Sequence, residues 1–150
     1  MRYPYVVAAC FAMLIASSGL VAAAPTVVNL TQTGCQFVEP EGVDHQFKTS
    51  QATDCKAINK QNGTKRLNAS KPLELKPGKY IFRVTNQNVP YELGFYLRGS
   101  GLGRLTLPKV SGGGLTTGKT QDYHIDLKES SYVYSCPLNP TPDYPIVVKP

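Results

Sequence analysis

Residues 123–136 read YHIDLKESSYVYSC, and this stretch indicates the fold class. Apolar and polar side chains alternate on both sides of a turn-forming KESS segment. The side chains that share one face are Tyr123, Ile125 and Leu127, then Tyr132, Tyr134 and Cys136. Because successive side chains of a β-strand point to opposite faces, this period of two predicts two half-buried strands joined by a turn. Cys136 is then expected to point into one end of the folded domain.

The same alternation continues outward from this stretch in both directions. Short apolar runs, separated by turns rich in Gly, Pro and Asn, occupy residues 27–30, 36–38, 73–75, 80–84, 93–97, 105–107 and 146–148. The segment Ser111-Gly-Gly-Gly114 is expected to be a flexible turn. About eight short strands at turn-separated intervals indicate an all-β chain folded as an antiparallel β-sandwich or barrel.

An insertion at about residues 43–70 interrupts this pattern. Apolar residues recur at helical spacing over residues 52–60, which predicts one short helix. Thr49 or Ser50 is suited to cap its start, and Gly63 is suited to end it.

Composition limits the classes of protein that this chain can belong to. Its 150 residues are 41% hydrophobic and 17% charged, which fits one globular domain and excludes collagen, coiled coil and a largely disordered chain. The formal charge of +6 over 150 residues is a lower density of positive charge than a nucleic-acid-binding arm has. There is no phosphate-binding loop, nucleophile elbow or H-E-x-x-H motif, and the residues after position 23 contain no C-x-x-C motif. We therefore expect a protein that is not an enzyme.

Residues 1–23 are typical of a secretory signal peptide. Arg2 precedes an uncharged stretch over residues 5–24, and small residues suit cleavage near Ala23. A membrane anchor is the alternative, because about 20 apolar residues can span a bilayer. The interruption at Ser17-Ser18-Gly19 favours the signal peptide. The mature domain then covers residues 24–150 and has no later membrane span. We expect it to be periplasmic or secreted.

Cleavage leaves an odd number of cysteines. Cys10 is lost with the signal peptide, and Cys35, Cys55 and Cys136 remain. Exported proteins meet an oxidising compartment in which cysteines pair, so one thiol is expected to stay unpaired.

Two segments of the C-terminal half resemble a cupredoxin. LKPGKYIFRVTN, residues 75–86, is similar to the strand that leads toward a first copper ligand, and YVYSCPLNPTPD, residues 132–143, is similar to the strand and loop that carry the copper thiolate. The resemblance implies a Greek-key β-sandwich.

Blue copper needs two imidazoles beside the thiolate. Leu138, Asn139 and Pro140 stand where the later histidine is expected, and Tyr91-Glu92 where the earlier one is expected. The sequence therefore predicts a site without histidine.

The chain is also similar to the cupredoxin-like domain of periplasmic iron-uptake proteins of the EfeO type, which lack these histidines. The matching residues are Cys35 in TGCQF, Glu92 in PYEL and Cys136 in YVYSC. The resemblance implies a transition-metal site built from these three, holding copper or, alternatively, iron. It also implies a role in periplasmic metal handling or electron transfer, with a metal-uptake or redox protein as partner.

Several assignments stay open at this stage. Cys35 can form a disulfide with Cys55, which the low apolar content of the insertion favours, or it can join Cys136. Glu92 can bind a metal or pair with Arg98, since a carboxylate beside an apolar strand needs a partner. Further metal candidates are Tyr91, at the position of the lost imidazole, Asp143 and His45.

A second function remains in competition with metal binding. The chain can be a metal-free β-sandwich that binds a partner protein, with Tyr91 and Leu138 filling the pocket where a cupredoxin holds copper.

Overall fold

The computed structural model describes residues 23–150. The predicted signal peptide, residues 1–23, therefore lies outside the described residues, apart from Ala23 itself. In the part of the chain that is described, no helix is both long and apolar enough to cross a membrane.

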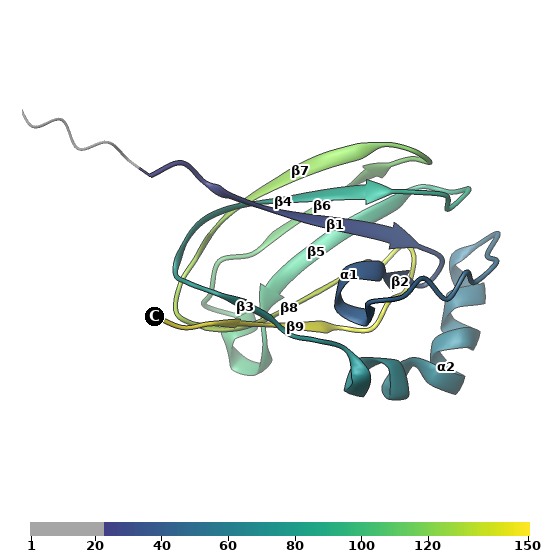
Figure 1. Ribbon diagram of the computed structural model, residues 1–150, viewed down its shortest axis with the longest axis horizontal. Coiled ribbons are helices and arrows are strands. Elements are labelled where there is room, and N and C mark those ends of the chain that lie inside the picture. Colours follow the sequence, from purple (N-terminus) through teal and green to yellow (C-terminus); the bar gives the residue numbers. More distant parts are fainter. Residues whose placement is uncertain (1–22) are drawn as a thin grey trace, which may run out of the picture.

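Nine strands between residues 23 and 150 form two sheets, which confirms an all-β sandwich (Figure 1). The four-stranded sheet has the order β2 (Gln36–Phe37), β1 (Thr26–Thr33), β4 (Gly78–Asn86) and β7 (Thr120–Leu127). The five-stranded sheet has the order β3 (Leu73–Leu75), β9 (Tyr144–Val148), β8 (Ser130–Ser135), β5 (Leu93–Gly99) and β6 (Val110–Leu115).

The expectation of purely antiparallel sheets is wrong at two strand pairs. β1 runs parallel to β4, with Leu30 opposite Val84, and β3 runs parallel to β9, with Leu75 opposite Val148. Parallel neighbours need a long connection between them. Residues 34–77 supply that connection for β1 and β4, because the chain passes through the helical insertion before it returns.

Aromatic rings from both sheets meet in the core, among aliphatic side chains. Phe95 of β5 lies 5.7 Å from Phe82 and 5.0 Å from Tyr123, both on the opposite sheet, between ring centroids. Phe37 of β2 packs edge-on against Tyr134 at 5.1 Å. These contacts bury the apolar faces that the alternation predicted for residues 80–84, 93–97, 123–127 and 132–136.

The expected strand over residues 105–107 and turn over residues 111–114 are both wrong. Residues 105–107 instead form a turn and bend after a 3₁₀ helix, η1 (Gly101–Arg104), and the glycines belong to β6. A Cβ on Gly94 would lie only 2.7 Å from the carbonyl oxygen of Gly112, so the two strands approach too closely for side chains there. The glycines thus permit the pairing of β5 with β6.

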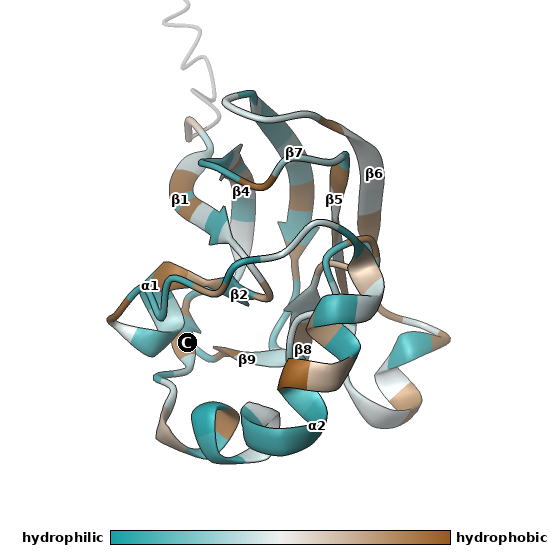
Figure 2. Ribbon diagram, turned by 90° about the vertical axis from the view of Figure 1, so that its right-hand side faces the viewer, coloured by the Kyte–Doolittle hydropathy of each residue, from teal (hydrophilic) through white to brown (hydrophobic). Residues whose placement is uncertain are grey.

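The insertion carries a longer helix than predicted. After a short α1 (Val38–Glu41), α2 covers Ala52–Ala69 and continues through Gly63. Gln51, rather than Thr49 or Ser50, is its N-cap residue, in a capping box with Asp54. The helix is mostly hydrophilic, as its teal colour shows (Figure 2). Arg66 connects the second half of α2 to the rest of the domain, through Glu41 and the carbonyl oxygen of Cys35.

Candidate functional site

Cys136 lies directly after β8, at the end of the sandwich where the chain bends from residue 89 into β5. Its side chain is 1% exposed. Its Sγ accepts hydrogen bonds from the backbone N–H of Gly94 at 3.3 Å and of Asn139 at 3.2 Å. The end of β8 that leads into Cys136 and the bend that carries Glu92 therefore meet at one end of the fold.

The surroundings of Cys136 act on its pKa in opposite directions. Burial raises the pKa of the thiol, while hydrogen bonds from the backbone of Gly94, Asn139 and Leu138 and from the side chain of Gln32 lower it. Burial dominates, and the pKa is raised overall. The thiol is thus neutral at neutral pH, but its sulfur already has the donors that would stabilise a thiolate.

Gln32 brings a second polar side chain to this place. It is fully buried, and its Nε2 donates to the carbonyl oxygen of Gly94 at 2.8 Å. Its Oε1 has no hydrogen-bond partner. A buried amide oxygen without a partner is costly, since it has lost its hydration without compensation. Sequence reasoning missed this residue because nothing in the local pattern distinguishes Gln32 from other strand residues.

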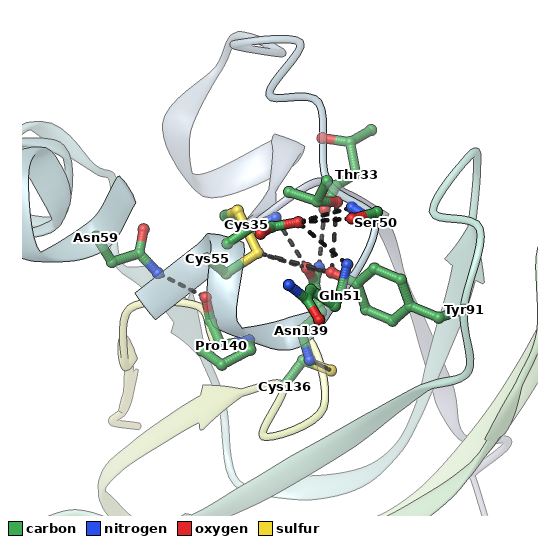
Figure 3. Close-up of a disulfide and its surroundings, with 12 residues drawn as sticks. Thr33, Cys35, Ser50, Gln51, Cys55, Asn59, Tyr91, Cys136, Asn139 and Pro140 are labelled. Carbon is green, nitrogen blue, oxygen red and sulfur yellow. Dashed lines mark hydrogen bonds between the residues drawn. A yellow bond between two sulfur atoms is a disulfide. The ribbon is translucent and has the colours of Figure 1, made fainter. Parts of the chain in front are cut away.

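Cys35 and Cys55 form a disulfide, as the low apolar content of the insertion favoured (Figure 3). The bond joins the β1–β2 turn to α2, and both cysteines are fully buried. Cys35 adopts a positive φ of 64° at this turn. In this state Cys35 offers no thiolate to a metal, and Cys136 is the free cysteine among the described residues.

Asn139 connects Cys136 to the disulfide; sequence reasoning noted it only as one of three residues where the later histidine of a cupredoxin is expected, and gave it no role. Its Oδ1 accepts the backbone N–H of Cys35 at 2.9 Å and lies 3.0 Å from Sγ of Cys55. Its Nδ2 donates to the carbonyl oxygen of Thr33 at 2.9 Å. Figure 3 shows Asn139 between the disulfide, Tyr91 and Cys136. The available signal was its place between Pro137 and Pro140, which restrict the loop.

Glu92 and Tyr91 lie at the same end of the molecule. Glu92 is exposed and accepts the backbone N–H of Gly114 at 2.7 Å. The Tyr91 hydroxyl lies 3.2 Å from Oδ1 of Asn139 and 3.3 Å from Oγ1 of Thr49, and partial burial raises its pKa.

Asp143 and His45 have other partners. Arg98, considered as a partner for Glu92, instead donates to Asp143 at 2.7 Å and to Ser135 at 3.1 Å. His45 lies 2.8 Å from the carboxylate of Glu41.

Leu138, considered as a plug for the pocket, is 44% exposed and lines an open groove of about 700 Å³ over β6.

The described residues contain no group of three or more His, Cys, Asp or Glu side chains close enough to hold a metal ion. Blue copper requires two imidazoles and a thiolate, and the groups that hydrogen-bond the Cys136 sulfur are backbone N–H groups and an amide side chain. No family model matches this chain, and no curated protein matches it. The chemistry of Cys136 and its neighbours is the basis for a functional proposal.

Proposed function

We propose that this chain is an exported, cupredoxin-like, non-enzymatic protein that binds Cu(I) through Cys136. The observation that supports this most is the buried sulfur of Cys136 with two backbone N–H donors at hydrogen-bond distance. Such donors compensate part of the negative charge of a thiolate, which is the form that binds metal.

The chemistry of the donors favours copper over iron. A thiolate is a soft ligand and selects Cu(I), whereas harder ions prefer several oxygen ligands. Gln32, whose side chain hydrogen-bonds the Cys136 sulfur, has an unpartnered Oε1, and the carboxylate of Glu92 is exposed two residues before Gly94. When bound, Cu(I) would replace the thiol proton. The role we propose is periplasmic metal handling, with a metal-uptake protein as partner.

A titration with Cu(I) tests this proposal. Oxidised protein without its signal peptide competes with a chromophoric Cu(I) chelator, and we expect one ion bound per chain. Cys136→Ser is expected to remove this binding, whereas Asp143→Asn and His45→Gln, whose side chains pair elsewhere, are expected to retain it. Because the thiol must lose its proton, the affinity is expected to rise with pH. Undiminished binding by Cys136→Ser would refute the assignment.

A metal-free protein-binding module is the second candidate, and η1 supplies the observation in its favour. Leu102 is 87% exposed and Leu105 is 84% exposed. Leu102 lies in η1 and Leu105 is its C-cap residue, so the two exposed leucines lie one 3₁₀ turn apart. This function predicts no Cu(I) binding in the titration and loss of a chemically cross-linked partner in Leu102→Ser/Leu105→Ser.

A further inference from the structure

The two sulfur centres of the folded domain are linked through one side chain. Asn139 is fully buried, its backbone N–H donates to Sγ of Cys136, and its side chain contacts both halves of the disulfide. The loop that presents Cys136 is therefore fastened to the β1–β2 turn and to α2 by the same residue that donates to the thiol.

The disulfide determines where these fastening groups lie. Asn139 needs the N–H of Cys35 and the carbonyl oxygen of Thr33 at fixed positions, 2.9 Å from its Oδ1 and Nδ2. Thr33 is the last residue of β1 and Cys35 lies in the turn that follows, which the bond to Cys55 ties to α2. Tyr91 adds its hydroxyl to the same Oδ1 at 3.2 Å.

We propose that the Cys35–Cys55 disulfide and Asn139 act as one positioning unit for Cys136, so that the Cys136 site is completed only after the disulfide has formed. In forming the bond, the two thiols lose two protons and two electrons to a disulfide-type oxidant, which is reduced to two thiols. Cys136 then remains as the free thiol of the described domain. The consequence for metal binding rests on the proposed function; the consequence for the thiol itself does not.

The rate of Cys136 alkylation under native conditions tests the proposal without any metal. A buried thiol reacts only when its loop opens locally. Loss of the hydrogen bonds that keep the loop closed therefore raises the population of the open form and the alkylation rate. We expect Asn139→Ala, which keeps the disulfide and the backbone N–H at position 139, to react about tenfold faster than the unmodified protein. Cys35→Ala/Cys55→Ala is expected to show a similar increase.

Combining the changes shows whether they act as one unit. If they do, the triple variant reacts no faster than Asn139→Ala alone, since a shared interaction can be removed only once. Effects that multiply in the triple variant, or an unchanged rate in Asn139→Ala, would overturn the proposal. If the double cysteine variant does not fold, the Asn139→Ala rate decides the part of Asn139, and site-resolved alkylation of Cys136 in the unmodified protein before and after reduction of the disulfide decides the part of the disulfide.

Two controls separate positioning from general stability. Leu127→Ala, at the end of the four-stranded sheet where β7 pairs with Gly78, lowers global stability away from the loop, and Asn88→Ala changes an exposed asparagine; both are expected to react at the unmodified rate. A Cu(I) titration of the same variants forms the second arm, with a weaker affinity expected in Asn139→Ala. Absence of Cu(I) binding in the unmodified protein would refute the proposed function and leave the alkylation result to decide the positioning unit.

Discussion

Glu41 is a buried carboxylate whose partners decide its charge. It accepts hydrogen bonds from Arg66, at 2.7 Å to Nη2, from the hydroxyl of Tyr144 and from His45. Burial raises the pKa of Glu41, but the hydrogen bonds from Arg66 and Tyr144 and the charge of Arg66 outweigh it, so the pKa is lowered overall. An ionised Glu41 is therefore part of the folded state at neutral pH.

Glu41→Gln is expected to destabilise the fold by about 3–5 kcal/mol at pH 7, because it leaves Arg66 buried without its counter-charge. The free energy of unfolding in urea measures this. Since the folded pKa lies below the unfolded value, the contribution of Glu41 is present above the unfolded pKa and disappears as the pH falls through the folded one. Glu74→Gln, which breaks only the exposed pair with Lys149, is the matched control and is expected to change little.

Tyr123 and Cys136 contribute to the change of folding stability at alkaline pH. Burial raises the pKa of Tyr123 to about 12 and raises the pKa of Cys136. A raised pKa means that the folded state holds its proton more tightly, so stability is complete below the unfolded pKa and falls as the pH rises through the folded one. We expect the free energy of unfolding to decline from about pH 9 to about pH 12. Tyr123→Phe is expected to flatten the upper part of this decline, and an unchanged slope would contradict the assignment.

At the scale of elements, the close approach of β5 and β6 fixes the end of the sandwich that holds Cys136. The backbone N–H of Gly94 donates to the sulfur, and a Cβ on Gly94 would meet the carbonyl oxygen of Gly112 at 2.7 Å. The register of the two strands also shifts between Leu93 and Phe95.

Gly94→Ala is therefore expected to push β5 away from β6 and to cost about 1–3 kcal/mol, in the range of overpacked sites. Thermal unfolding measures the stability, and alkylation of Cys136 reports the loss of its donor. Ser111→Ala, at an exposed position of β6, is the control and is expected to behave as the unmodified protein. A Gly94→Ala protein of full stability would show that the strands separate without cost.

The elements that sequence reasoning identified are those with a local signal. Residues 80–84, 93–97 and 123–127 alternate regularly, and all three lie within strands. The glycine segment over residues 111–114 carries no side-chain pattern, so its pairing with β5 could not be predicted. The second half of α2 has no apolar face and is fastened by Arg66 to Glu41 and to the carbonyl oxygen of Cys35, contacts between residues far apart in the chain.

At the scale of the whole molecule, the disulfide closes a loop between residues 20 apart. It ties the largely polar α2 to the sandwich, and removing it is expected to cost about 3 kcal/mol. Urea unfolding of Cys35→Ala/Cys55→Ala against the oxidised protein measures this. When the protein is unfolded, reduced and then refolded with its disulfide open, we expect a similar loss of stability, whereas the same treatment should leave the double variant unchanged. Equal stability of the oxidised protein and the double variant would contradict the stabilising role of the disulfide.

The sequence by itself determined the all-β class and favoured the Cys35–Cys55 pair, because the alternation and the low apolar content of the insertion are local properties of a chain. The structure decided between that pair and a link to Cys136. Only the tertiary structure decided the parallel pairings, and only it brought Gln32, Gly94 and Asn139 to Cys136. Those neighbours come from separate strands and loops, and their hydrogen bonds leave no periodic trace along the chain. Their positions depend on how the two sheets pack.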